Sequence, residues 1–429
     1  MPLRTNRPVL QRRMLIFTCK VTTVCLVVSL LYGQKAFAQF HYNVLHGFSG
    51  THGDGAEPQG SVALDSAGSV YGTTGGGGIY GAGVVFELIS KPNGTWSEAL
   101  LHTFDGTDGA WPTGGPTLDV AGNVYGTTSG GGAHNGGTVF QLRPSEGTWT
   151  EETIYDFCAE PNCIDGTGSW ASLMLDNAGD LFGTGSVVFE LVPLHDGNWT
   201  EMVLHTFAGT NGDALDARAG VIADANGNLY GTAGDGGGSN KCIGGCGIVY
   251  ELSPIPDDAG SVWQERILHA FGISQNDGQL PLFGQLAMDR RGNLYGTTSQ
   301  GGANLCFAGC GTVFELSHTS TGHWVERVLY NFKFDSSGFG PGGSVVIDKA
   351  GNLYGTTING GSENCGCGVV YKLSPQPGGQ WQYTVLHTFV GADGAQPDAN
   401  LTLDDNGNIY GTTLTGGPGG AGVVFEITP

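Results

Sequence analysis

Short runs of apolar residues recur along this chain, and Gly, Asp, Asn or Pro bounds each run. The first four runs cover residues 61–64, 69–74, 84–88 and 99–104. Runs of this length, rich in Val, Leu, Tyr, Phe and Thr, are typical of β-strands joined by tight turns. The 77 Gly and 18 Pro leave no long window with the period of an amphipathic helix. The pattern predicts an all-β protein made of four-stranded antiparallel units.

The set of four runs is repeated seven times. Each copy reads, with variation, W-x-E-x-x-L-H-T-F, D-G-A-x-P, L-x-L-D-x-x-G-N-L-Y-G-T-T, a Gly-rich loop and G-x-V-F-E-L. In the L-D-x-x-G-N turn, the Asp carboxylate can accept hydrogen bonds from amides just ahead, and Gly supplies a positive φ. A repeat this long indicates a propeller or a solenoid. The Y-G step of the seven copies begins at Tyr71, Tyr125, Phe182, Tyr230, Tyr295, Tyr354 and Tyr410.

The two ends of the repeat array are complementary. Residues 40–48 match only the last strand of a unit, and the chain stops at Pro429, directly after a third strand. In an open solenoid both ends would be unpaired edges, whereas in a ring they would pair. We therefore predict one domain, residues 39–429, that is a seven-bladed β-propeller closed by an N-terminal outer strand pairing with the C-terminal blade. A β-helix is the alternative, but its coils are much shorter than this period.

Residues 1–38 lie outside the repeats and have the pattern of a cleaved signal peptide. A basic segment precedes an apolar stretch, residues 21–31, that is short for a membrane span, and Ala36-Phe37-Ala38 is a cleavage motif. Arg12-Arg13 leaves twin-arginine export open, although we favour the general secretory route. We expect a soluble protein with no membrane span, exported to the periplasm or the cell exterior.

The cysteines support an oxidising compartment. Two fall in the predicted signal peptide, and the other eight form four close pairs, which predicts a disulfide within each loop. Zinc is the weaker alternative, because the pairs lie on different units. The C-x-C pair closes a strained ring, so its internal bond is the least certain of the four. The pairs are Cys158/Cys163, Cys242/Cys246, Cys306/Cys310 and Cys365/Cys367.

The charge is strongly acidic. The chain carries a formal charge of −22, and removal of the basic signal peptide leaves 11 Lys and Arg against 39 Asp and Glu. Such a surface disfavours nucleic acid and anionic membranes and suits cations, sugars or basic partners. Solubility alone would also explain it. We expect a monomer.

The run G-N-L-Y-G-T-T-x-x-G-G, followed by G-x-V-F-E-L and L-H-x-F, resembles the tandem repeat of exported bacterial proteins called Gloeo/Verruco, or GloVer, repeat proteins of the choice-of-anchor group. The resemblance is clearest over residues 122–142, 292–316 and 351–373 and covers essentially the whole chain after the signal peptide. The third unit departs from it, because residues 182–185 run straight into Val187 without a Gly-rich loop. The C-terminal sorting anchor usual in the family is not seen either. The resemblance implies export and brings no activity with it.

One face of the predicted ring gathers the D-G-A-x-P loops and the Gly-rich loops. Trp111 and Trp170 enter this face beside the missing loop of the third unit, close to Asp108 and Asp165. Aromatic rings stack on sugar faces and carboxylates accept hydrogen bonds from hydroxyls, so these four residues form a candidate glycan site. The alternative is turn chemistry that recurs because the unit recurs. The aspartates of this rim are Asp54, Asp108, Asp165, Asp277 and Asp393.

Asp54, Asp277 and Asp393 are weaker candidates for a metal site, with calcium as the candidate cofactor because it prefers oxygen ligands. A histidine also recurs at one strand position. Such repetition is atypical of a catalytic residue, so we predict a buried hydrogen bond, for example to a Thr of the G-T-T run. The histidines are His46, His102, His205, His269 and His387, with Asp156 and Tyr330 assigned to the other two copies.

No catalytic residue is singled out, because the G-x-S-x-G, H-E-x-x-H and phosphate-loop motifs are missing from the sequence. The sequence favours an exported binding or scaffold module whose ligand is a glycan, a cation or a protein. Two alternatives stay open. One is a glycan hydrolase or lyase with its site near units two and three, and the other is a structural protein of the envelope or matrix.

Overall fold

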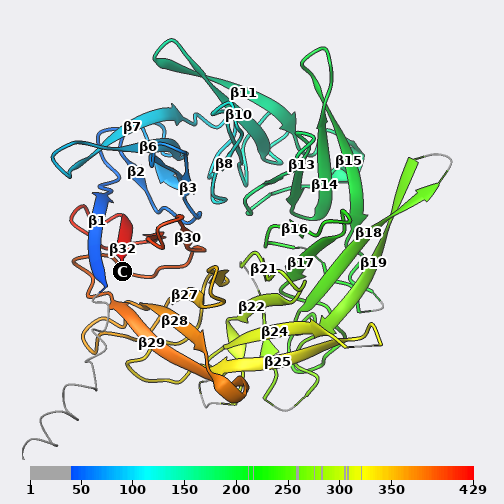
Figure 1. The fold of residues 1–429 in the computed structure, drawn as a ribbon. Coiled ribbons are helices and arrows are strands. Elements are labelled where there is room, and N and C mark those ends of the chain that lie inside the picture. Colours follow the sequence, from blue (N-terminus) through cyan, green and yellow to red (C-terminus); the bar gives the residue numbers. More distant parts are fainter. Residues whose placement is uncertain are drawn as a thin grey trace, which may run out of the picture. The chain divides into compact units, whose positions relative to one another are not determined.

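A computed structural model describes residues 40–429 except 211, 216, 258–259, 275, 282–283, 304–305, 307–308 and 320. The predicted signal peptide, residues 1–38, lies outside the described residues. Residues 40–428 form one compact unit. In it, seven four-stranded antiparallel sheets follow one another around a ring, so the predicted seven-bladed β-propeller is confirmed (Figure 1).

The blades are numbered in chain order, and the strands of each blade are given from the innermost to the outermost. Blade 1 contains β3 (Ala63–Leu64), β4 (Val70–Thr74), β6 (Val84–Ser90) and β7 (Trp96–Thr103). Blade 2 contains β8 (Thr117–Leu118), β9 (Val124–Thr127), β10 (Thr138–Ser145) and β11 (Thr148–Asp156). Blade 3 contains β12 (Met174–Leu175), β13 (Leu181–Thr184), β14 (Val187–Pro193) and β15 (Trp199–Thr206). Blade 4 contains β16 (Ile222–Ala223), β17 (Leu229–Ala233), β18 (Ile248–Asp257) and β19 (Gly260–Ala270).

The remaining blades follow the same plan. Blade 5 contains β21 (Ala287–Met288), β22 (Leu294–Thr298), β24 (Thr312–His318) and β25 (Trp324–Asn331). Blade 6 contains β26 (Val346–Ile347), β27 (Leu353–Thr357), β28 (Val369–Pro375) and β29 (Trp381–Thr388). Blade 7 contains β30 (Thr402–Leu403), β31 (Ile409–Thr413), β32 (Val423–Thr428) and β1 (His41–Gly47). Two short two-stranded sheets join the loops: β2 (Gly55–Ala56) pairs with β5 (Gly76–Gly77), and β20 (Gly278–Gln279) pairs with β23 (Gln300–Gly301). The 3-10 turns are η1 (Pro161–Cys163) and η2 (Pro377–Gly379).

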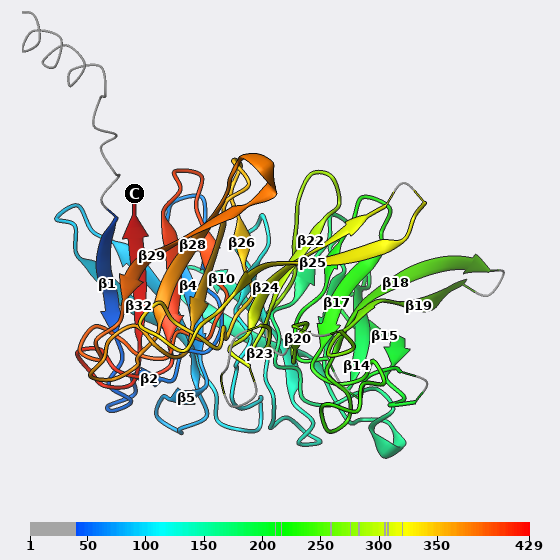
Figure 2. The same ribbon diagram turned by 90° about the horizontal axis from the view of Figure 1, so that it is seen from below.

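The N-terminal strand closes the ring. β1 pairs antiparallel with β32, from His41 opposite Thr428 to Gly47 opposite Val423, and forms the outer strand of blade 7. Figure 1 shows β1 lying beside β32, and Figure 2 shows β2 and β5 at the lower edge of the ring, on the face of the connections between blades. The predicted closure is therefore confirmed, and it leaves the ends of the array paired instead of exposed.

The repeated turn forms for the expected reason. In blade 1, Asp65 Oδ1 accepts hydrogen bonds from the amides of Ala67 and Ser69, at 2.9 and 2.8 Å, and Gly68 has a φ of 85°. The Gly of the Y-G-T-T strand has a packing role. A Cβ on Gly72 would lie 2.2 Å from Cζ of Phe86, so the outer end of the Phe86 ring can approach the β4 backbone only because no side chain is there.

The core is divided into separate apolar clusters, each between two neighbouring blades. At the boundary of blades 7 and 1, Phe48 packs on Phe86 with ring centroids 5.1 Å apart, and both rings are fully buried. Burying one such side chain contributes roughly 2–3 kcal/mol. Each blade therefore depends on its two neighbours, which is why a chain of this length can fold as one ring.

A threonine hydrogen bond also crosses the blade boundaries. The first Thr of Y-G-T-T donates through its hydroxyl to a backbone carbonyl at the start of the next inner strand, as Thr127 does to Ala171 O at 3.0 Å. Thr412 makes the closing contact with Gly60 O at 3.1 Å. Thr232 is the exception among the described residues, because its buried hydroxyl has no hydrogen-bond partner. The other donors are Thr73, Thr184, Thr297 and Thr356.

Candidate functional sites at the blade boundaries and the channel mouth

A β-bulge at one position of each outer strand turns a side chain toward the neighbouring blade. In blade 1, Val85 lies opposite His102 and Phe86 opposite Leu100, so Leu101 is the extra residue. Bulges re-aim side chains in this way. In blade 2 the same register places Tyr155 opposite Val139. The assignment of Asp156 to the histidine position of that copy was therefore wrong, because Tyr155 follows Trp149 by the same six residues that separate His102 from Trp96.

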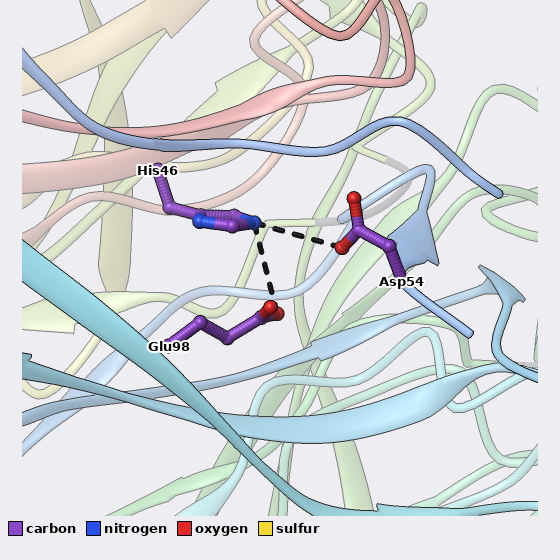
Figure 3. Close-up of side chains that lie close together, drawn as sticks. All are labelled: His46, Asp54 and Glu98. Carbon is purple, nitrogen blue, oxygen red and sulfur yellow. Dashed lines mark ion pairs between the residues drawn. The ribbon is translucent and has the colours of Figure 1, made fainter. Parts of the chain in front are cut away.

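The histidines meet carboxylates from two other elements. At the boundary of blades 7 and 1, His46 of β1, Asp54 of the following connection and Glu98 of β7 point toward one another (Figure 3). His46 Nε2 lies 3.6 Å from Asp54 Oδ1 and 3.7 Å from Glu98 Oε1. The partners of these histidines are carboxylates, so the expected bond to a Thr was wrong. The same type of interface cluster recurs as His102/Asp108/Glu151, His205/Asp213/Glu265 and His269/Asp277/Glu326.

The loop aspartates are held by their own connections. Asp54 accepts hydrogen bonds through Oδ2 from the amide and the hydroxyl of Ser49, both at 2.7 Å, which leaves Oδ1 facing the cluster. Asp108 accepts a bond through Oδ1 from the amide of Asp105 and turns Oδ2 to His102 Nε2 at 2.8 Å. The rim aspartates of the sequence are thus boundary residues. Their cluster partners, the glutamates of the W-x-E motif, were not foreseen.

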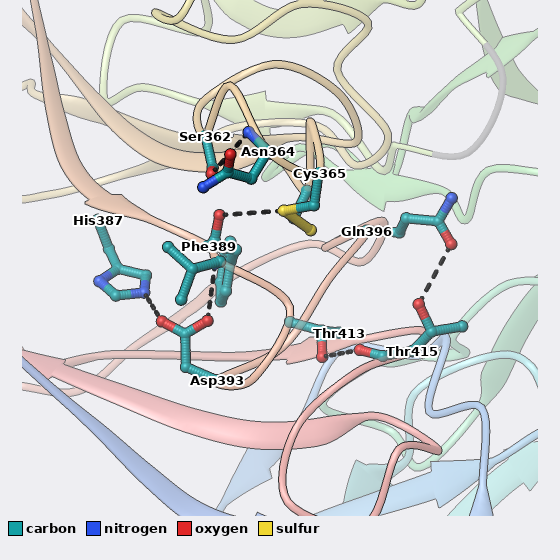
Figure 4. The surroundings of a disulfide bond; sticks show 11 residues. Ser362, Asn364, Cys365, His387, Phe389, Asp393, Gln396, Thr413 and Thr415 are labelled. Atoms are coloured by element: carbon teal, nitrogen blue, oxygen red, sulfur yellow. Dashed lines mark hydrogen bonds and ion pairs between the residues drawn. A yellow bond between two sulfur atoms is a disulfide. The ribbon is translucent and has the colours of Figure 1, made fainter.

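Three boundaries replace a cluster member with tyrosine. Tyr42 occupies the glutamate position at the boundary of blades 6 and 7 and stacks on His387, with ring centroids 3.7 Å apart. There His387 Nε2 approaches Asp393 Oδ2 to 2.9 Å (Figure 4). The other two boundaries contain the Tyr155/Asp165/Glu201 group, in which Tyr155 donates to Asp165 Oδ2 at 3.2 Å, and the stacked pair Tyr330/Tyr383.

The glutamates of the blade-boundary clusters have raised pKa values, so they are weaker acids than an ordinary glutamate. Burial raises the pKa of Glu201, Glu265 and Glu326 to about 7, with repulsion from the neighbouring aspartates adding to the effect. Burial also raises the pKa of Glu98 and Glu151, although the nearby His46 and His102 oppose the shift. Two carboxylates that are both partly removed from water favour a shared proton or a cation.

The four predicted disulfides are confirmed: Cys158–Cys163, Cys242–Cys246, Cys306–Cys310 and Cys365–Cys367. The second Cys of the last three pairs is buried and packs into a blade boundary, as Cys246 does beside Phe271. Figure 4 shows the disulfide of Cys365 above the His387–Asp393 pair. Disulfides of this number indicate an oxidising location outside the cytoplasm.

The structure separates the four predicted glycan ligands. Asp108 is engaged by His102, and Asp165 is 2% exposed and accepts bonds from Tyr155 and the amide of Ala159. Trp111 is 55% exposed and has a φ of 58°, with its ring over Gly130. Trp170 is 42% exposed and lines a cavity. Trp170 lines this cavity, whereas Trp111, Asp108 and Asp165 do not.

That cavity lies at the mouth of the central channel and measures about 150 Å³. Its lining comes from the connections into six different blades. Five of the lining residues stand five positions after the loop aspartate of their repeat, or its equivalent in blade 4, and we call them the channel-mouth ring. They are Gln59, Thr113, Trp170, Arg218 and Asp398.

The channel-mouth ring combines an aromatic surface with charge and free hydrogen-bonding capacity. The guanidinium of Arg218 lies 5.7 Å from the centroid of the Trp170 ring, within the range of a cation–π contact. The buried atoms Thr113 Oγ1 and Asp398 Oδ1 have no hydrogen-bond partner. Burial raises the pKa of Asp398 to about 6. Unpartnered buried polar atoms in a cavity wall are suited to contact a ligand or ordered water.

Sequence reasoning missed Arg218 and Asp398. A signal for them existed, because the fifth position after the loop aspartate differs in every described copy, whereas the residue before it is mostly Pro and the residue after it is Gly or Ala. The aspartate of the blade 3 to blade 4 connection, Asp213, was also missed, since its loop reads D-A-L-D in place of D-G-A.

The fold and these sites define a disulfide-bonded β-propeller with polar clusters between its blades and a small cavity at its axis. The chain belongs to the Gloeobacter/Verrucomicrobia repeat family, whose model matches residues 34–243 and 239–429. The resemblance seen in the sequence is thereby confirmed.

Three solved structures are similar to this chain at low sequence identity. A luciferin-regenerating enzyme is 16% identical, covering 73% of this chain and 90% of its own, with a TM-score of 0.42. A putative 6-phosphogluconolactonase from Bacteroides uniformis is 13% identical, covering 80% and 88%, with a TM-score of 0.49. A protein of unknown function from Dyadobacter fermentans is 11% identical, covering 91% and 99%, with a TM-score of 0.44. The search of curated proteins gave no match. Among the described residues, no helix is long and apolar enough to cross a membrane.

Proposed function

We propose that this protein is an exported, non-enzymatic binding module that holds a glycan at the channel mouth. The observation that carries the proposal is the variation of the channel-mouth ring. Gln, Thr, Trp, Arg and Asp occupy one equivalent position in five repeats, and all five residues line one cavity. The fold accepts each of these residues, because a four-stranded blade follows every one of them.

The chemistry of the ring suits a sugar. Trp170 offers an aromatic face of the kind that stacks on the apolar face of a pyranose, and Arg218 beside it can donate to hydroxyl or carboxylate oxygens. Asp398 and Thr113 supply polar atoms without partners in the protein. The cavity is smaller than the roughly 300–1,000 Å³ typical of sites for drug-sized ligands. The expected ligand is therefore a terminal sugar unit of a chain that continues into solvent.

Binding is better supported than hydrolysis. A glycosidase needs two carboxylic groups on either side of the scissile bond. Among the described residues that line the cavity, Asp398 is the one carboxylate. Asp108 and Asp165, the acids of the alternative site near blades 2 and 3, are engaged at blade boundaries.

The proposed location follows from the disulfides and the signal-peptide pattern. We place the protein in the periplasm or outside the cell after cleavage of residues 1–38. An acidic, disulfide-bonded ring in that compartment would meet envelope or environmental glycans, and it would act as a monomer.

Two tryptophans of the same loop type provide the test. A glycan array identifies the ligand, and calorimetry then compares Trp170→Ala with Trp111→Ala. Trp111 is the matched control because it is exposed on the same kind of connection but does not line the cavity. We expect Trp170→Ala to weaken binding about fivefold to tenfold, in line with the loss of roughly 1–1.5 kcal/mol of stacking, and Trp111→Ala to change it less than about twofold. Equal effects of the two variants, or no glycan bound at millimolar concentration, would overturn the proposal.

A further inference from the structure

We propose that the interface cluster of His46, Asp54 and Glu98 is a binding site for a divalent cation of the zinc type. The site is independent of the glycan site, because it lies between the outer strands of blades 7 and 1 and not at the axis. It joins β1, the connection after β1 and β7, so a bound cation would bridge the closing strand to the first blade.

The distances fit ligands around a common centre. At 3.6 and 3.7 Å, His46 Nε2 is too far from both carboxylate oxygens for good hydrogen bonds. Two ligand atoms each about 2.0–2.2 Å from a cation, at a tetrahedral angle, lie roughly 3.3–3.6 Å from each other. The three atoms thus stand close to the separation that a shared ion requires, and all three lie within 4.8 Å of one another.

The converging atoms are buried and otherwise unused. His46 Nε2, Asp54 Oδ1 and Glu98 Oε1 have no hydrogen-bond partner. Asp54 is fixed by the two bonds from Ser49 to its other oxygen, which is how supporting contacts orient metal ligands. The side chains are 18–22% exposed, so the cluster lies near the surface although its converging atoms are buried.

One boundary of the same chain shows the arrangement without the glutamate. At the boundary of blades 6 and 7 the glutamate is replaced by Tyr42, and His387 closes on Asp393 to 2.9 Å, an ordinary hydrogen bond. In the His46 cluster, where the glutamate is present as the second carboxylate, His46 and Asp54 stay 3.6 Å apart. His205 and Asp213 are likewise not hydrogen-bonded, at 3.5 Å, whereas His269 makes a long hydrogen bond to Asp277 at 3.4 Å and His102 a short one to Asp108 at 2.8 Å.

The donor set selects the kind of cation. One imidazole nitrogen and two carboxylate oxygens suit Zn²⁺ in a site with an open fourth position. Calcium, which the loop aspartates alone suggested, prefers six or more oxygen ligands and does not match a site with a nitrogen donor. Two carboxylates and a neutral imidazole also leave a charge that a divalent ion neutralises.

The test uses metal content and a spectroscopic probe. The purified exported protein is stripped with EDTA, dialysed, reloaded with ZnCl₂ and analysed by mass spectrometry of bound zinc; cobalt loading reports coordination through its visible absorption. Glu98→Tyr copies the side chain that the chain itself uses at Tyr42 and should keep the fold. We expect this variant to lose one zinc equivalent and the matching fraction of the cobalt absorption.

Two further variants keep the test decisive. Glu98→Gln should show the same loss if Glu98→Tyr fails to fold. His387→Gln, at the boundary without a glutamate, should lose no zinc. A wild-type protein that binds no zinc at micromolar concentration, or a Glu98 variant that retains every equivalent, would overturn the proposal and identify the cluster as a proton-sharing contact only.

Discussion

Tyr42 lies flat on His387, with the two rings 3.7 Å apart at the centroids and inclined by 6°. This contact is the seventh-blade version of a boundary that elsewhere pairs histidine with glutamate. The tyrosine and the glutamate differ in chemistry but occupy the same position of the repeat. Tyr42 stands two residues after Phe40, as Glu98 stands two residues after Trp96. One propeller thus contains both a charged and an aromatic way of joining blades, and each can serve as a control for the other.

The boundary threonines should differ in their response to the loss of a hydroxyl. Thr127→Val leaves the buried Ala171 carbonyl without its donor, so we expect a loss of about 1–2 kcal/mol in the free energy of unfolding. Thr232→Val removes a buried hydroxyl that has no partner and should be neutral or stabilising. Chemical denaturation measures both. Equal losses for the two variants would contradict this account of the ring.

Ring closure should depend on β1. Deleting residues 40–47 leaves the β32 edge unpaired, and we expect association into oligomers and a lower melting temperature. Light scattering after size exclusion detects the change. A deleted protein that stays monomeric and melts as the wild type does would contradict closure by this strand.

Glu201 should make stability depend on pH. Its pKa is about 7 in the folded protein, above an ordinary value of 4.5, so the protonated form is favoured on folding. The stabilising contribution is complete below pH 4.5 and is lost as the pH rises through 7. Glu201→Gln should match the wild type at pH 4.5 and exceed it at pH 8 by on the order of 1 kcal/mol, a discounted figure because the group is partly solvated.

The measurement is denaturant unfolding at the two pH values in the presence of EDTA, which keeps cations out of the comparison. Glu363→Gln, at an exposed position, is the control and should show no gain at pH 8. A Glu201→Gln variant that is less stable than the wild type at pH 8 would show that the carboxylate is ionised and stabilising there.

The two cysteines of one disulfide should not be equivalent. Cys246→Ala and Cys242→Ala both break the same bond, but Cys246 is fully buried among Phe271 and its neighbours, whereas Cys242 is partly exposed. We expect the Cys246 variant to be less stable by about 1 kcal/mol more, because it also leaves a small void. Thermal melting without reductant compares them. Indistinguishable variants would mean that Cys246 contributes only through its bond.

The architecture could be predicted from the sequence because each blade repeats its signals. Seven Y-G steps gave the blade count, the half-unit at residues 40–48 gave the closure, and close Cys spacing gave the disulfides. These features depend on residues near one another in the chain, where turn chemistry and strand period act directly.

The sites could not be predicted in the same way, because their members come from separate elements. Asp54 and His46 are close in sequence, but Glu98 reaches them only after a complete blade has formed. The bulge that directs His46 toward Glu98 changes the strand register by one residue and has no clear mark in the sequence. Arg218 and Trp170 meet at the axis for the same reason, since only the curvature of the ring brings their connections together.

The pairing of β1 with β32 also sets the order of events when the chain is made and folds. Synthesis releases β1 first, yet its partner in the sheet is the final strand, more than 370 residues later in the sequence. Six blades can assemble as their residues emerge, but the seventh has to wait for the last residues. Until then the N-terminal strand has no partner, so the ring is completed only after the last strand is available, in a single late step.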